Sequence, residues 1–194
     1  MGLHLKNVIY ILGLLVMVCC KPDAKPRKVS YYPSKEHFDD KSVLTPIDLD
    51  TTSLSFWDIF LMTPDIDYRK NVPFFEIEND SNIKRIVPFI PTHVKLTELM
   101  TITMDSVITD KRYNLSDLDT VMQNTFGNQE VSAFYDYRES QHAVRVLIDI
   151  DTSSSGKELK KILLKTTDAF DKVKNTASDS LYLYIYFSAL RSLY

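Results

Sequence analysis

Cysteine is nearly absent from this 194-residue sequence, and its two cysteines, Cys19 and Cys20, lie side by side near the N-terminus. The rest of the chain can therefore form no disulfide and contains neither a thiol nucleophile nor a cysteine-based metal site. Such a chain has to be stabilised by burying apolar side chains. Its hydrophobic content of 44% is enough for a core, which excludes a disordered chain.

Glycine is also scarce, because only four glycines occur and two of them lie within the first 20 residues. The other two, Gly127 and Gly156, each fit a helix end. The sequence Ser155-Gly156-Lys157 suggests a phosphate-binding loop. That loop, however, requires glycine where Asp151 stands and serine or threonine where Glu158 stands. The composition therefore argues against a phosphate site lined by backbone groups.

An excess of positive charge is missing as well. The formal net charge is −3, whereas a nucleic-acid-binding surface is basic, so we expect no nucleic-acid partner. None of the four histidines stands at metal-ligand spacing from another, and neither HExxH nor a Gly-x-Ser-x-Gly elbow occurs. They are His4, His37, His93 and His142. We predict no metal and no cofactor.

The first 20 residues are typical of a signal peptide: Lys6 precedes the apolar run Val8–Val18, which is too short to span a bilayer comfortably. The run ends in two cysteines and the sequence turns polar at once. This change from apolar to polar residues at a cysteine resembles the lipobox of bacterial lipoproteins, in which a cysteine becomes the lipidated first residue. The lipobox has a small residue just before its cysteine. Cys20 follows Cys19, which is smaller than the Val18 that precedes Cys19, so Cys20 is the expected lipid site and Cys19 is the second choice. An ordinary secretory signal and an uncleaved membrane anchor are the alternatives.

Residues 21–50 contain four prolines among lysines and aspartates, which predicts a semi-extended tether. Residues 51–194 are then a single domain. Early in this domain Ser55 and Asp58 indicate a helix start. Two strands, 72–77 and 83–90, are predicted to form a hairpin, with Pro88 limiting the second strand to a sheet edge or an irregular exit.

Strands and helices alternate in the second half of the domain. Period-two alternation predicts strands over 98–108, 130–137, 143–151 and 181–188. Helical spacing predicts helices over 116–126 and 156–174, with Ser116 and Ser155 as N-caps. Because each helix has one apolar face, we expect an α+β fold, a two-layer sandwich in which two helices cover a mixed sheet. No internal repeat is apparent.

Two aspartates, Asp149 and Asp151, follow the predicted strand over 143–151. Asp-x-Asp after an apolar strand resembles the first motif of haloacid-dehalogenase-like phosphatases, in which one aspartate is the nucleophile and both approach Mg²⁺. The Gly-Thr that usually follows is missing, and the remaining chain is too short for the rest of that fold. The alternative interpretation is two solvated carboxylates at a strand end.

Three tyrosines, Tyr182, Tyr184 and Tyr186, share one face of the last predicted strand, opposite its aliphatic side chains. Aromatic rings with a polar tip are frequent at binding surfaces, so this stripe is a candidate recognition surface for a protein or a glycan. The equally open alternative is that this face packs beneath a helix or the N-terminal segment.

Between residues 98 and 188 the order of elements resembles the periplasmic domain of the ExbD/TolR family, the small partners of proton-driven motor complexes. The matching segments are Met100–Val107, Tyr113–Leu118, Arg145–Asp151, Gly156–Phe170 and Tyr182–Phe187. The family's proton-handling aspartate in its N-terminal membrane helix has no counterpart in Val8–Val18. The resemblance implies a periplasmic interaction module without motor chemistry.

From these features we expect a non-enzymatic lipoprotein of the bacterial cell envelope. A lipid would anchor it to a membrane, its domain would lie outside the cytoplasm, and it would act as an accessory module that binds a protein partner. The alternatives are a small metal-dependent hydrolase that uses Asp149 and Asp151, and an immunity protein that neutralises a toxin.

Overall fold

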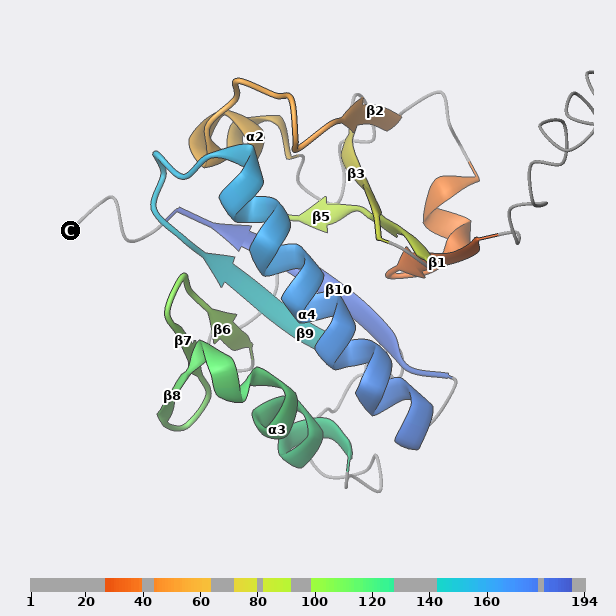
Figure 1. Ribbon diagram of the computed structural model, residues 1–194, viewed down its shortest axis with the longest axis vertical. Helices are drawn as coiled ribbons and strands as arrows, with labels where there is room; N and C mark the ends of the chain where they lie inside the picture. Colours follow the sequence, from red (N-terminus) through yellow and green to blue (C-terminus); the bar gives the residue numbers. More distant parts are fainter. Residues whose placement is uncertain are drawn as a thin grey trace, which may run out of the picture.

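The structure is a computed structural model that describes residues 27–39, 44–63, 72–79, 82–91, 99–127, 143–177 and 180–189. Within these residues ten strands form two sheets, and helices pack against them (Figure 1). The fold is α+β, as the sequence predicts. None of the helices in the described ranges is long and apolar enough to cross a membrane.

The first sheet has four strands in the order β1-β4-β3-β2. Their bounds are Lys28–Tyr32 for β1, Leu44–Ile47 for β2, Val72–Glu78 for β3 and Asn82–Ile86 for β4. The predicted antiparallel pairing is confirmed for β3 and β4, while β1 and β2 join the outer edges in parallel. The second predicted strand, 83–90, is too long, because β4 ends at Ile86 and Pro88–Phe89 belongs to the other sheet. The second sheet was not expected, because only one sheet was predicted.

The prediction of a tether over residues 21–50 is wrong at the described residues 28–39 and 44–50. Two strands of the first sheet lie in this range, and so does a short 3-10 helix, η1 (Lys35–Phe38). Tyr32, Phe38 and Ile47 are buried. The prolines misled the prediction, because Pro46 lies on β2 at a sheet edge, where a missing N–H breaks no ladder hydrogen bond.

The second sheet has six strands in the order β5-β10-β9-β6-β7-β8. Their bounds are Pro88–Phe89 for β5, Met100–Ile102 for β6, Ser106–Ile108 for β7, Arg112–Asn114 for β8, Ala143–Asp149 for β9 and Tyr182–Ser188 for β10. From β5 to β6 all neighbours are parallel, and β6, β7 and β8 are antiparallel. Pro88 lies at the edge, as expected, and the predicted strand 130–137 lies outside the described residues.

The single strand predicted over 98–108 is wrong, because the chain turns between β6 and β7. The Thr103 hydroxyl accepts a hydrogen bond from the backbone N–H of Ser106 at 3.0 Å and donates to the Asp105 carboxylate at 2.8 Å. Side-chain bonds of this kind stabilise a turn at the expense of an extended strand. The alternation of apolar and polar residues persists through the turn, and this is why it resembles one long strand.

Three α-helices are described: α2 (Phe56–Met62), α3 (Leu118–Met122) and α4 (Gly156–Thr176). The helix start predicted at Ser55 and the N-cap predicted at Ser155 are confirmed, and the structure has a capping box at both. Ser116, in contrast, caps nothing. It lies inside a 3-10 turn, Leu115–Asp117, that leads into α3. A π-helical turn, Gln123–Gly127, follows α3 directly.

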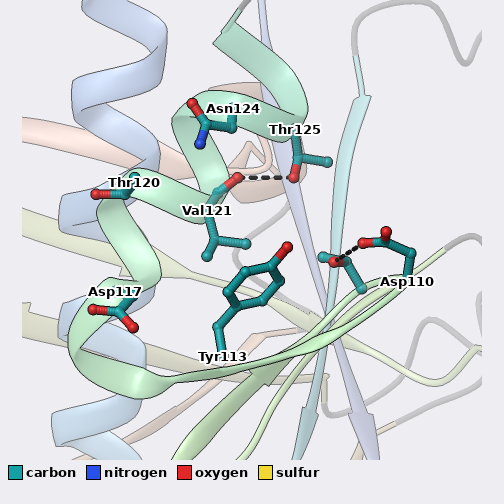
Figure 2. Close-up of a pocket in the computed structure, with 8 residues that line it drawn as sticks. Asp110, Tyr113, Asp117, Thr120, Val121, Asn124 and Thr125 are labelled. Atoms are coloured by element: carbon teal, nitrogen blue, oxygen red, sulfur yellow. Dashed lines mark hydrogen bonds between the residues drawn. The ribbon is translucent and has the colours of Figure 1, made fainter.

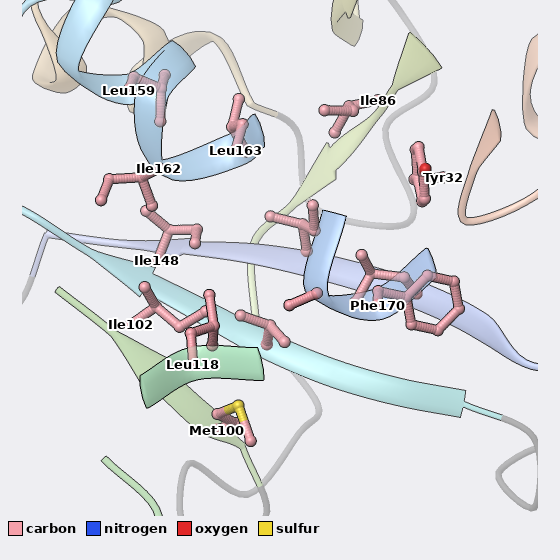
Figure 3. Close-up of a cluster of buried hydrophobic side chains, with 14 of the residues drawn as sticks. Tyr32, Ile86, Met100, Ile102, Leu118, Ile148, Leu159, Ile162, Leu163 and Phe170 are labelled. Carbon is pink, nitrogen blue, oxygen red and sulfur yellow. The ribbon is translucent and has the colours of Figure 1, made fainter. Parts of the chain in front are cut away.

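One core joins both sheets through α4 (Figure 3). The apolar stripe of α4, from Leu159 to Val173, packs on the even-numbered side chains of β9 and the odd-numbered ones of β10. Phe75 and Ile86 from the four-stranded sheet belong to the same cluster, and α3 adds side chains to it. The expected pair of helices therefore covers the six-stranded sheet, and α4 also packs against the four-stranded sheet.

The structure reveals an internal repeat that the sequence analysis missed. The units β2–α2–β3 and β9–α4–β10 each consist of two parallel, neighbouring strands joined by a helix. Each strand leads into the pattern Ile-Asp-(Leu/Ile)-Asp-Thr, at Ile47–Thr51 and at Ile148–Thr152. Each helix then starts with a capping box. The helices have 7 and 21 residues, so the likeness is confined to a short stretch.

The turns of the two units contact each other. The backbone N–H groups of Phe56 and Trp57 donate to the carbonyl oxygens of Ser154 at 2.7 Å and Thr152 at 3.0 Å. A Cβ at Gly156 would lie 2.8 Å from the carbonyl oxygen of Leu49. This close approach, rather than a helix end alone, accounts for the glycine at this position.

Candidate functional site

The candidate tyrosine stripe is exposed at one end only. Tyr182 is 42% exposed, whereas Tyr186 is 3% exposed and packs with Leu99 and Leu147. Burial raises the pKa of the Tyr186 hydroxyl. Tyr186 therefore lies in the interior, and its assignment to an exposed recognition surface is corrected.

Tyr184 lies between these two tyrosines and is half-buried. The ring of His37, from η1, lies 6.2 Å from the Tyr184 ring and 5.9 Å from that of Phe89. The alternative interpretation, that the N-terminal segment covers this face, thus holds for Tyr184. The stripe could not be resolved from alternation alone, because alternation defines the two faces of a strand and not what lies over each.

The two aspartates of the hydrolase alternative have different surroundings. Asp149 is buried at the end of β9, whereas Asp151 is exposed in the following turn. The Asp151 carboxylate accepts hydrogen bonds from the backbone N–H and the hydroxyl of Ser153, and these bonds lower its pKa. Asp151 therefore stabilises the turn that leads into α4. Among the described residues no group of three or more His, Cys, Asp or Glu side chains could hold a metal ion.

A buried ion network links the four-stranded sheet to α4. Lys84 on β4 is 1% exposed, and its Nζ lies 2.7 Å from Asp168 Oδ1 and 2.9 Å from Asp171 Oδ2. Tyr32 on β1 donates a hydrogen bond to Asp171 Oδ1 at 2.7 Å. Burial, with Asp171 beside it, raises the pKa of the Tyr32 hydroxyl. The sequence gives little signal for this site, because its residues are distant along the chain.

A surface hollow of about 410 Å³ lies between α3 and the β7–β8 hairpin (Figure 2). Tyr113 rises from β8 into this space. The lining offers hydroxyl, amide and carboxyl groups and contains no histidine, cysteine or lysine. Its residues are Thr109, Asp110, Tyr113, Asp117, Thr120, Val121, Asn124 and Thr125. These side chains can form hydrogen bonds with a polar partner, but they include no pairing of a nucleophile with a base.

The short helix α2 exposes apolar side chains. Leu61 is 63% exposed and Trp57 39%, and Met62 is also exposed. The ring of Phe60 stacks on that of Trp57 with centroids 5.6 Å apart.

No family model, curated protein or solved structure matches this chain. The predicted lipid sites Cys20 and Cys19 lie outside the described residues. The lipoprotein signal and the ExbD/TolR resemblance therefore stay predictions.

Proposed function

We propose that this protein is a non-enzymatic lipoprotein of the bacterial cell envelope, anchored by a lipid on Cys20 and acting as an accessory module that binds a protein partner. The observation that carries the proposal is the short interval between anchor and domain. Only residues 21–27 separate Cys20 from Lys28, where β1 begins. A segment of this length spans less than about 30 Å, so a lipid on Cys20 would hold the domain against the membrane.

The surroundings of the candidate catalytic groups support a binding role. Asp151 is engaged in the turn before α4, and neither it nor Asp149 lines the polar hollow beside α3. The hydrolase alternative therefore gains no support from the geometry. No particular observation favours the immunity-protein alternative.

Two surface features are suited to a partner. One is the exposed ring of Tyr182, because aromatic rings concentrate interface energy. The other is the polar hollow, which adjoins the C-terminal end of α4, since Gln123 Nε2 donates to Thr176 Oγ1 at 3.0 Å. Tyr182 follows that end of α4 along the chain. Tyr182 lies on the face of β10 opposite α3 and α4, so the two features are separate surfaces.

The anchor is tested by growing cells with radioactive palmitate. The parent protein should be labelled and shortened by cleavage, and Cys20→Ala should be neither, while Cys19→Ala should keep both properties. A Cys20→Ala protein that is labelled as strongly as the parent would contradict the assignment.

Partner binding is tested with a photo-crosslinking amino acid placed at Tyr182 in cells. A discrete crosslinked product is expected there, and none is expected at the exposed control position Lys161 at the other end of α4. The same products at both positions, or at neither, would argue against a partner at Tyr182.

A further inference from the structure

The polar hollow beside α3 has walls that are held in place on both sides (Figure 2). One wall is the β7–β8 hairpin, and the backbone N–H of Leu115 just after it donates to the carbonyl oxygen of Asp105 at 2.9 Å. The other wall is α3, whose Asp119 forms an ion pair with Lys172 of α4, and Val121 on this wall is buried. A site whose walls are already ordered loses less conformational entropy when a ligand binds.

The size of the hollow suits a small ligand. Its volume of about 410 Å³ lies toward the lower end of the range of about 300–1,000 Å³ that is usual for ligand pockets. The hollow can therefore accept a small molecule or the terminal unit of a longer chain.

Three polar side chains of the lining have no hydrogen-bond partner within the part of the chain that the structure describes. They are Tyr113, Thr120 and Asn124. Two other hydroxyl groups are engaged, because Thr109 donates to the Asp110 carboxylate and Thr125 donates to the carbonyl oxygen of Val121, both at 2.8 Å. Hydroxyl and amide groups can each donate and accept a hydrogen bond. The hollow therefore offers a ligand three neutral groups of mixed donor and acceptor character.

The ring of Tyr113 gives the hollow an apolar element as well. This side chain is half-buried and packs against the main core, so its position is fixed. It rises from β8 into the hollow (Figure 2). A tyrosine in such a position presents an apolar ring face beside a polar hydroxyl group.

The lining discriminates between classes of ligand by charge and polarity. It contains two carboxylates, Asp110 and Asp117, and no lysine, arginine or histidine, so it repels an anion. An apolar ligand would displace water from the hydroxyl and amide groups without replacing the lost hydrogen bonds. A cation could pair with the two carboxylates, but both are exposed, and exposed ion pairs contribute little.

We propose that this hollow binds a neutral sugar, with a pyranose ring against Tyr113 and its hydroxyl groups hydrogen-bonded to Thr120 and Asn124. Each sugar hydroxyl group both donates and accepts, as the three neutral groups of the lining do, and the C–H groups of the ring form an apolar face that packs on an aromatic side chain. This inference goes beyond the protein partner proposed at Tyr182. It does not depend on the anchor at Cys20, because every residue that carries it lies in the described domain.

Saturation-transfer difference NMR tests this proposal, since it detects the sugar protons that contact a protein. The full-length protein is purified in a detergent without a sugar headgroup and mixed with maltose or cellobiose. We expect saturation of the ring protons of at least one disaccharide, with half-saturation at about 1 mM, the affinity of a few hydrogen bonds and one stacked ring. At pH 6 glucose should compete for the site, glucosamine should compete no better than glucose, and glucuronate should not compete.

The matched variants remove one hydrogen-bonding group each from the exposed part of the lining. Asn124→Ala and Thr120→Val should each weaken binding roughly fivefold. The control is Asn175→Ala, the same change at an exposed asparagine of α4 that does not line the hollow, and it should leave the affinity unchanged. Melting curves of all three variants show that the domain remains folded.

Four results would overturn the inference. Neither disaccharide could receive saturation. Asn124→Ala and Thr120→Val could bind as tightly as the parent, which would place the sugar elsewhere. Glucosamine could compete more strongly than glucose, which would make the hollow a cation site. A photo-crosslinking amino acid at Asn124 could give a discrete protein product in cells, which would mean that a protein occupies the hollow. Crosslinking at Tyr182 and palmitate labelling are read separately, so the proposed function and the sugar site can fail independently.

Discussion

Replacing Lys84 by methionine should destabilise the domain substantially. Lys84 holds two carboxylates of α4 against the four-stranded sheet, and methionine retains most of the apolar stem while removing the ammonium group. Removing one partner of a buried ion pair costs about 3–5 kcal/mol. Here Asp168 and Asp171 are 51% and 34% exposed, so water partly solvates them after the loss. We therefore expect a smaller loss of about 2–3 kcal/mol in the free energy of unfolding.

Urea denaturation of the parent and variant proteins measures this loss, and it corresponds to a fall in melting temperature of roughly 5–10 °C. The matched control is Lys161→Met, the same change at an exposed position of α4, which should stay within about 0.5 kcal/mol. Adding Asp171→Asn to Lys84→Met should cost less than Asp171→Asn alone, because the two charges act as a pair. A Lys84→Met protein as stable as the parent, or strictly additive losses, would refute the role of this network.

Four other outcomes are expected. A chain that begins at Thr51 should lose its cooperative thermal transition, because it lacks β1 and β2, whereas a chain that keeps both strands should retain it. Gly156→Ala should destabilise by more than about 1 kcal/mol in urea melts, since its Cβ would strike backbone; an unchanged stability would show that the turns can separate. Leu183→Ala should cost about 2–5 kcal/mol through its cavity and Tyr182→Ala less than about 0.5 kcal/mol. The raised pKa of Tyr32 means that the unfolded chain releases this proton first, so stability should fall above about pH 10; Tyr32→Phe should make that fall shallower in urea melts at several pH values, and an identical pH slope would contradict it.

The sequence was most informative where local rules decide the structure. Helix α4 was predicted because its capping box and its apolar stripe depend only on neighbours along the chain. The edge position of Pro88 followed from its missing N–H. Proline was misleading at Pro46, because an edge strand and a tether tolerate proline equally well.

The candidate site was harder to predict, because it depends on contacts between distant residues. The alternation in β10 correctly put Leu183 on the buried side, but only the structure shows that η1 lies against Tyr184 and that Tyr186 is interior. The sequence gives no sign that Lys84 is buried, since its partners Asp168 and Asp171 are more than 80 residues away. Whether the face of a strand opposite the core is exposed depends on which distant parts of the chain pack against it.

The two repeat units show how one local pattern can serve two purposes. In both units a strand, an Ile-Asp-(Leu/Ile)-Asp-Thr turn and a capping box set the direction of the helix that follows. The long helix α4 then spans the core and places lysines outward, so its outer side is solvated. The short helix α2 keeps the same start but places apolar side chains outward. The exposed side chains of α2 are Trp57, Leu61 and Met62, whereas Phe60 packs against the core, so the outer side of the short helix is only partly set by packing.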